Sequence, residues 1–282
     1  MRFIALSIAF LSFFPFHASL RAESDDPAKQ CAAATEGSDL ALAISHCTAV
    51  IESGQLSDRE LADALNERGL IHHRNRDYDA AIRDYNRTLT LQPKFGRALV
   101  RRAQAYQEKR DYERSLADYE AAIQMDPKLV FERPKGFLLF YLGRMTQSAE
   151  TFENYMKSNP GDVWVILLRY LVEAKIGSAL AAARDLEVDA GRLNSRDWPS
   201  PIIHFHLGKI GEKALFAAAN DPDPKIKNEK TCAVNFHAGE ARLLRAHISG
   251  AVPLLRAAEK DCPSHFHESH GASTELKRLG LK

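Results

Sequence analysis

The chain has 282 residues, of which 45% are hydrophobic, enough apolar side chains for a sizeable core. Its 12 prolines and 15 glycines are too few for a disordered or collagen-like polypeptide. A formal net charge of +1 gives no electrostatic footprint for nucleic acid or for an anionic membrane surface, so neither is predicted as a partner.

The first 22 residues are predicted to be a signal peptide rather than part of the fold. Arg2 precedes the apolar run FIALSIAFLSFFPF, which is too short to span a bilayer as a mature helix. Signal peptidase could cut after the small residue Ala22, or after Ala18. No cysteine stands at the end of the apolar run, so we expect a periplasmic or secreted protein without a lipid anchor, in which residues 23–37 form a mobile lead-in.

The first helix of the folded body is expected to begin at Ser38, followed by the acidic Asp39 in its first turn. Ser38 is of a type favoured at helix N-caps, and Gly54 is suited to end the helix. Ser57 and Glu60, three residues apart, then form a capping-box pattern that opens a second helix.

Two matched segments follow, GLIHHRNRDYDAAIRDYNRTLTLQP and AQAYQEKRDYERSLADYEAAIQMDP. The residues that recur 34 positions on are Tyr78, Tyr85 and Pro93, matched by Tyr112, Tyr119 and Pro127. A fixed period near 34 residues is typical of stacked helical hairpins. Since one hairpin cannot bury its own apolar face, neighbouring hairpins are expected to pack on one another.

The spacing inside each copy resembles the tetratricopeptide repeat (TPR) family. A small residue is followed by a second small residue after 12 positions, an aromatic or large apolar residue after 16, and proline after 24. Three consecutive copies are Gly69, Ala81, Tyr85 and Pro93; Ala103, Ser115, Tyr119 and Pro127; and, more weakly, Gly136, Ser148, Phe152 and Pro160. The resemblance implies an all-α, TPR-type solenoid of helical hairpins. Pro134 is expected to shorten or kink the first helix of the third hairpin.

A fourth copy of the spacing lies far downstream, at Gly239, Ala251, Leu255 and Pro263. Pro253 falls early in its second helix and weakens the match. The predicted organisation is therefore a TPR array at 38–160, degenerate helical repeats at 161–224, and a TPR-like hairpin with a capping helix at 225–282.

Four cysteines allow three disulfide pairings, and export favours disulfide formation. If the fourth copy is a hairpin, Cys232 begins its first helix and Cys262 ends its second. These ends are neighbours in an antiparallel pair, so a disulfide there is sterically natural. Cys31 and Cys47 are the remaining, equally local pair.

The layout also resembles the NlpI-like periplasmic TPR proteins of Gram-negative bacteria. The export signal, the first repeat, the segment WPSPIIHFHLG and the ending CAVNFHAGEARLLR…CP carry this resemblance, which covers roughly residues 38–280. It implies a scaffold whose partners are envelope proteases or peptidoglycan-remodelling enzymes. The lipid-attachment cysteine of that group is missing, so a membrane anchor is not expected.

In TPR arrays the first helix of each hairpin lines a concave groove that binds a peptide or a partner helix. The side chains expected to line this groove are Asn66, His73, Arg97, Gln104, Arg133, Phe137, Phe140 and Tyr141. The lysine and asparagine set that clamps a peptide carboxylate in chaperone-binding members is not reproduced, since Leu70 stands where asparagine is needed. Phe137 and Phe140 equally fit the core between repeats, because their three-residue spacing suits either role.

No arrangement typical of a catalytic nucleophile, a phosphate-binding loop or a dinucleotide site is present, so we expect no catalytic residue and no cofactor. His265, His267 and His270, with Glu268, are the best metal candidate, but a clear fourth ligand is lacking and no metal site is predicted. The predicted function is a non-enzymatic, exported scaffold that binds a protein or peptide. The alternatives are a metal-dependent enzyme built on these histidines, and a structural homodimer whose groove is filled by the second copy.

Overall fold

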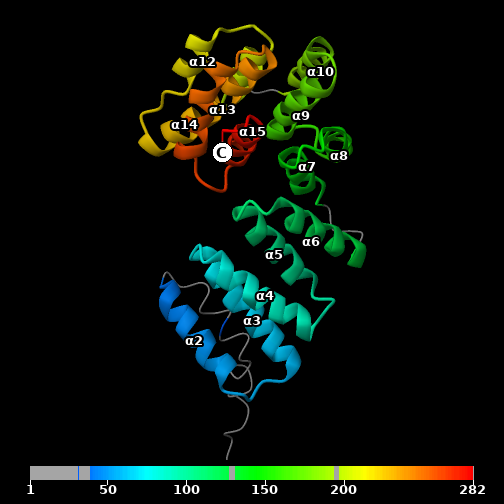
Figure 1. The fold of residues 1–282 in the computed structure, drawn as a ribbon, viewed down its shortest axis with the longest axis vertical. Coiled ribbons are helices and arrows are strands. Elements are labelled where there is room, and N and C mark those ends of the chain that lie inside the picture. Colours follow the sequence, from blue (N-terminus) through cyan, green and yellow to red (C-terminus); the bar gives the residue numbers. More distant parts are fainter. Residues whose placement is uncertain (1–30, 32–38, 127–130, 194–196, 282) are drawn as a thin grey trace, which may run out of the picture. The chain divides into compact units, whose positions relative to one another are not determined.

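The structure is a computed structural model that describes residues 31, 39–126, 131–193 and 197–281. The predicted signal peptide, the lead-in apart from Cys31, the proposed cap Ser38 and Pro127 lie outside these residues. The described residues form 14 helices and no strand, which confirms the all-α prediction (Figure 1). None of these helices is long and apolar enough to cross a membrane. The chain divides into two compact units after Pro93, within the predicted N-terminal array.

The first unit contains α2 (Leu40–Glu52), α3 (Asp58–Arg74) and α4 (Tyr78–Leu91). Asp39 is the N-cap of α2, and its side chain accepts a hydrogen bond from the backbone N–H of Leu42 at 3.0 Å. The predicted capping box opens α3, since Ser57 accepts from the Glu60 N–H and the Glu60 carboxylate accepts from the Ser57 N–H. Asp39 was expected one position inside the helix, but its carboxylate reaches the free N–H groups of the first turn.

The hairpin of α3 and α4 closes where the predicted small residue Gly69 meets Tyr85. A Cβ atom added at Gly69 would lie 2.6 Å from the ring of Tyr85, so a larger residue does not fit without movement of a fully buried ring. Arg68 spans the same two helices and binds Asp84 through two hydrogen bonds of 2.7 and 2.8 Å. The close helix contact and the ion pair together set how α3 lies on α4.

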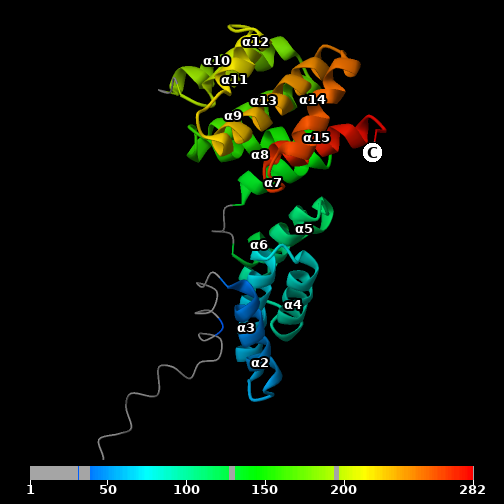
Figure 2. The ribbon, with the colours of Figure 1, turned by 90° about the vertical axis from the view of Figure 1, so that its left-hand side faces the viewer.

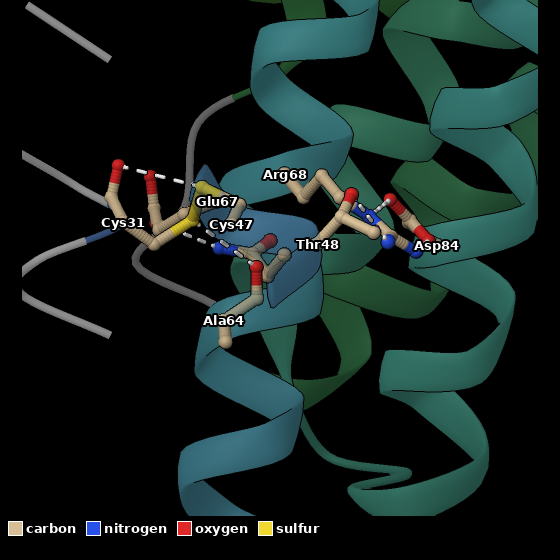
Figure 3. Close-up of a disulfide and its surroundings, with 8 residues drawn as sticks. Cys31, Cys47, Thr48, Ala64, Glu67, Arg68 and Asp84 are labelled. Carbon is tan, nitrogen blue, oxygen red and sulfur yellow. Dashed lines mark hydrogen bonds and ion pairs between the residues drawn. A yellow bond between two sulfur atoms is a disulfide. The ribbon is translucent and has the colours of Figure 1, made fainter. Parts of the chain in front are cut away.

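The Cys31–Cys47 disulfide forms in the first unit and ties Cys31 to α2 (Figure 3). Cys31 and Cys47 are both fully buried, and a small cluster with Ala43 and Ile71 surrounds them. Thr48, the residue after Cys47, accepts a hydrogen bond from the Arg68 guanidinium at 3.1 Å, so α2 is joined to the ion pair of the hairpin (Figure 3).

The second unit contains eleven described helices (Figures 1 and 2). Their bounds are α5 (Gly96–Glu108), α6 (Tyr112–Met125), α7 (Glu132–Tyr141), α8 (Met145–Ser158), α9 (Val163–Ile176), α10 (Ala179–Arg192), α11 (Ser200–His206), α12 (Glu212–Ala218), α13 (Pro224–Leu244), α14 (Ile248–Asp261) and α15 (His267–Arg278). Antiparallel hairpins form from α5 and α6, α7 and α8, α9 and α10, and α13 and α14. They share one continuous apolar core that runs from Ala103 to Leu276.

The third hairpin follows the predicted repeat despite its proline. α7 has 10 residues against 13 in α5, and Pro134 stands in its first turn, where a helical N–H has no intrahelical acceptor. A Cβ atom at Gly136 would lie 2.3 Å from the Phe152 ring. The hydroxyl of Ser148 donates to the Gly136 carbonyl at 2.8 Å, a cross-helix bond that the small repeat positions allow.

The fourth hairpin is also present, but its first helix differs from the prediction. α13 begins at Pro224 rather than at Cys232, because Asp223 caps it and Pro224 suits the first helical position. Cys232 therefore lies inside α13, level with Cys262 at the end of the shorter α14, and the predicted disulfide forms with a Cα–Cα distance of 5.1 Å. Pro253 lies within α14, which continues through it.

Candidate functional site

The last helix, α15, lies against both helices of the fourth hairpin and against the first helix of the third. It packs on α7, α13 and α14 (Figures 1 and 2). Arg110, just after α5, donates from its guanidinium to the carbonyl and hydroxyl oxygens of Ser269, both at 3.1 Å. Lys175 of α9 donates to Glu275 at 2.8 Å. The chain's own helix thus covers α7 on the side that the sequence assigns to a binding groove.

Polar side chains of α15 are buried and are tied to the surrounding helices. The Nδ1 atom of His270 lies 2.9 Å from the Tyr112 hydroxyl. Lys175 lies 2.8 Å from a carboxylate oxygen of Glu275 and 2.8 Å from one of Glu240 in α13. Burial raises the pKa of Glu240 to about 7, although the Lys175 ammonium opposes that shift. These contacts connect α15 with α6, α9 and α13.

A pocket of about 430 Å³ opens beside α7, α13 and the start of α15. Its aromatic lining residues are Phe137, Tyr141, Trp164, Trp198 and Phe266. Its polar lining residues are Gln107, Arg133, Glu229, Lys230, His265, His267 and Glu268. Pockets that are largely apolar, with a few polar groups, are typical of binding sites in proteins. We call this the aromatic pocket.

Two histidines of α15 pack against aromatic rings that line the aromatic pocket. His267 meets Phe137 and Trp164 edge to face, with ring centroids 5.3 and 5.2 Å apart. His270 stacks on Tyr141 at 5.4 Å. Burial, together with the positive charge of a nearby arginine, lowers the pKa of each imidazole to about 3. Both rings are therefore neutral near pH 7.

Two cations at the pocket already have acidic partners. Arg133 binds Asp162 at 2.7 Å, and its guanidinium lies 5.1 Å from the centre of the Phe137 ring. Lys230 binds Asp221 at 2.8 Å, and its ammonium lies 5.7 Å from the Trp198 ring centre. Their charges are thus compensated within the protein.

Unlike Arg133 and Lys230, the acidic residue Glu268 has no oppositely charged partner among the described residues at the pocket. Its residue is 2% exposed, and one carboxyl oxygen lies 3.2 Å from Nε2 of the neutral His267. The other oxygen, Oε2, has no hydrogen-bond partner within the part of the chain that the structure describes. Burial raises the pKa of Glu268 to about 8, so the carboxyl group is mostly protonated at pH 7.

The groove residues predicted on α7 are more buried than expected. Phe140 is fully buried, with Lys175 and Arg278 over its ring, so it belongs to the core and the groove assignment is wrong for it. Phe137 and Tyr141 are each 5% exposed, because α15 covers them, yet both line the aromatic pocket. Arg133 is half-buried at the same pocket. The core alternative therefore holds for the phenylalanines.

The other predicted groove residues do not gather at this pocket. Asn66 and His73 belong to the first unit, where Asn66 is fully buried and His73 packs on Tyr78. A fully buried Asn66 cannot line an open groove, so that assignment is corrected. Arg97 and Gln104 are exposed on α5 of the second unit. The use of the exposed pair by a partner stays a prediction.

Sequence reasoning missed Trp164, Trp198, Lys230 and the role of Glu268 as pocket residues. They come from segments widely separated in the chain, and only the packing of α15 against both α7 and α13 brings them together. One signal was available. The chain has two tryptophans, and both line the aromatic pocket. Tryptophan is enriched among residues that dominate binding energy.

The three C-terminal histidines contact different partners. His270 reaches Tyr112, His267 lies among pocket rings, and His265 packs edge to face on Phe266. Among the described residues, no three His, Cys, Asp or Glu side chains are arranged to hold a metal ion.

Comparison with known proteins identifies the repeats. Two family models, each described as a tetratricopeptide repeat, match residues 62–95 and 96–129. A tetratricopeptide repeat protein from Parabacteroides merdae has a similar fold, with a TM-score of 0.62 at 18% identity over 89% of this chain and 98% of that one.

Two larger assemblies give lower scores. The APC/C hetero-tetramer Cut9-Hcn1 has a TM-score of 0.47 at 13% identity, over 93% of this chain and 50% of the other. Naa15/Naa10 bound to HypK-THB has a TM-score of 0.45 at 13% identity, over 90% of this chain and 34% of the other. This chain thus spans half or less of those two chains. The family-model matches show that residues 62–129 are two tetratricopeptide repeats, and the hairpin fold continues beyond them.

Proposed function

We propose that this chain is a non-enzymatic scaffold that binds a protein partner at the aromatic pocket of its second unit. Tetratricopeptide repeats support a role in protein interaction, and the pocket supplies a specific place for it. The observation that carries the proposal is the convergence of both tryptophans with Arg133 at one opening. Tryptophan and arginine are the residue types that most often dominate interface energy.

The covered surface of α7 favours a partner that inserts a side chain over one that lies along the whole groove. Since α15 packs on α7, an extended peptide would have to displace a helix held by the buried Lys175–Glu275 ion pair and the Tyr112–His270 hydrogen bond. The aromatic pocket is open without such displacement. A partner that anchors one residue in the pocket and contacts its rim fits this surface.

Site-specific photo-crosslinking in cells tests the proposal. Ile226 lines the pocket and is 42% exposed, so a photoreactive residue there should capture the partner. Val188 on α10 is 57% exposed and does not line the pocket, which makes it the matched control. We expect a crosslinked product from position 226 that is weak or absent from position 188. Equal products from both positions, or none from position 226, would show that the pocket is not the docking site.

We further propose that the protein is exported and that its partners are envelope proteases or peptidoglycan-remodelling enzymes. The basic and apolar N-terminus and the NlpI-like sequence segments support this. The two disulfides agree with an oxidising compartment. Intact mass measurement of the protein from cells should give a chain that begins after Ala22 or after Ala18. A full-length chain confined to the cytoplasm would contradict export.

A further inference from the structure

Glu268 has a carboxyl oxygen that nothing in the described structure uses. The residue is 2% exposed, it lines the aromatic pocket, and its Oε2 atom has no hydrogen-bond partner among the described residues. Leaving a buried polar atom without a partner costs free energy, so native proteins satisfy such atoms almost everywhere. Because Oε2 itself is buried, a ligand that donates a hydrogen bond to it would have to enter from the pocket that Glu268 lines.

The surroundings of Glu268 favour a positively charged donor. Aromatic faces attract cations, and Phe137 and Trp198 already lie under the cations of Arg133 and Lys230. Those two cations are neutralised by Asp162 and Asp221. The nearest side-chain partner of Glu268 among the described residues is the neutral His267, whose Nε2 lies 3.2 Å from Oε1, rather than a cation. A cationic ligand would supply the missing partner of the Glu268 carboxylate.

We propose that the aromatic pocket binds an alkylammonium group, with Glu268 as its carboxylate partner and aromatic rings as its walls. An ammonium is a compact charge whose N–H donors suit a single carboxyl oxygen, whereas a guanidinium presents five donors and favours a carboxylate that can accept two bonds side by side. An anion is disfavoured, since it would compete with Asp162 for Arg133 and with Asp221 for Lys230.

If the ammonium group belongs to a lysine of the protein partner, this inference rests on the proposed function. A free alkylamine has the same chemistry, so the site can be probed without a partner. Failure of both probes to bind would sink this inference but leave the crosslinking result at Ile226 to judge the docking site on its own.

Binding should depend on pH because Glu268 must ionise to pair with the cation. Other charged or titratable groups at the pocket are Arg133, Tyr141, Glu229, Lys230, His265 and His267. Burial keeps Tyr141 and His267 neutral between pH 7 and pH 9. With the pKa of Glu268 at about 8, its ionised fraction rises about tenfold between pH 7 and pH 9, while an alkylammonium stays charged. Affinity should rise by about the same factor.

The test is a titration of the full chain with n-butylammonium and with a blocked tripeptide that has a central lysine. The two indole N–H signals in the NMR spectrum report directly, because both tryptophans line the pocket. We expect both signals to shift with either probe, tighter binding at pH 9 than at pH 7, and at least a tenfold loss in Glu268→Gln. Glu229→Gln, at the same pocket, is the matched control and should retain the pH dependence.

Each outcome decides something. Binding of both probes supports an ammonium site, and binding of the tripeptide alone assigns it to a partner lysine. Equal affinity in Glu268→Gln and the wild type overturns the proposal, as does a preference for acetate over n-butylammonium. The melting temperature of Glu268→Gln, measured alongside, shows that lost binding does not come from unfolding.

Discussion

Arg68 binds Asp84 through two hydrogen bonds of 2.7 and 2.8 Å, and the same pair recurs 34 residues later as Arg102 and Asp118 at 2.6 and 2.7 Å (Figure 3 shows the first pair). In both hairpins the arginine comes from the first helix and the aspartate from the second. The carboxylates are 7% and 8% exposed. The 34-residue repeat therefore includes a buried arginine–aspartate ion pair with two hydrogen bonds, as well as the apolar pattern.

Asp84→Asn and Asp118→Asn should each lower the free energy of unfolding by about 2 kcal/mol, since a half-buried guanidinium loses its charged acceptor. Glu187 and Lys209 are 62% and 50% exposed and form the control pair, because exposed ion pairs contribute little. Urea unfolding of Asp84→Asn, Asp118→Asn and the control Glu187→Gln measures the loss in free energy of unfolding. Losses no larger than that of Glu187→Gln would mean that the two-bonded pairs do not stabilise the hairpins.

Gly69→Ala and Gly136→Ala should destabilise the protein by roughly 1–3 kcal/mol through overpacking. The added Cβ atoms would lie 2.6 Å from Tyr85 and 2.3 Å from Phe152, two fully buried rings. Gly191→Ala, in α10, meets nothing within 4 Å and should instead stabilise by up to about 1 kcal/mol through helix propensity. Thermal melts of the three variants give the comparison, and a stabilised Gly69→Ala would refute the close-contact argument.

The double substitution Cys232→Ser/Cys262→Ser should cost roughly 3 kcal/mol, because the disulfide closes a loop with a sequence separation of 30 residues in the unfolded chain. Melting temperatures with and without reductant provide the measurement. Reductant should lower the wild-type value more than that of the double variant, in which the Cys31–Cys47 disulfide remains. Equal sensitivity of both proteins would show that Cys232–Cys262 contributes nothing.

Glu268 should make stability fall as pH rises. Its folded pKa of about 8 lies above its ordinary value of 4.5, so the folded state holds a proton that the unfolded state has lost between those pH values. Raising the pH from 6 to 8 should reduce the wild-type free energy of unfolding relative to Glu268→Gln by on the order of 2 kcal/mol. Parallel urea titrations of both proteins check this.

The histidines of α15 act in the opposite direction and in another pH range. The pKa values of His267 and His270 are lowered from 6.5 to about 3, so their contribution to stability is lost as pH falls through that window. Both histidines are present in the wild type and in Glu268→Gln, so their contribution cancels when the two proteins are compared. A difference between wild type and Glu268→Gln that stayed constant from pH 6 to pH 8 would contradict a buried, protonated Glu268.

Local patterns determined most of the fold. The spacing of Gly69, Tyr85 and their equivalents predicts the hairpins because a close helix contact requires a small residue opposite a large ring. The capping box at Ser57 and Glu60 was predictable because its hydrogen bonds join residues three apart. The cysteine pairs were also predictable, since the two members of each pair are close in sequence, with separations of 16 and 30 residues.

The candidate site was decided by tertiary structure. Phe137 and Phe140 of α7 both belong to the buried core, yet only Phe137 also lines the aromatic pocket. The pocket forms because α15 packs over α7 from more than 120 residues away in sequence. The helix α15 is polar, so its sequence has no apolar stripe from which its burial could be predicted. Its burial depends on single long-range partners, Lys175 for Glu275 and Tyr112 for His270. A one-dimensional pattern records which residues recur at short range, whereas the pocket depends on which distant helices meet.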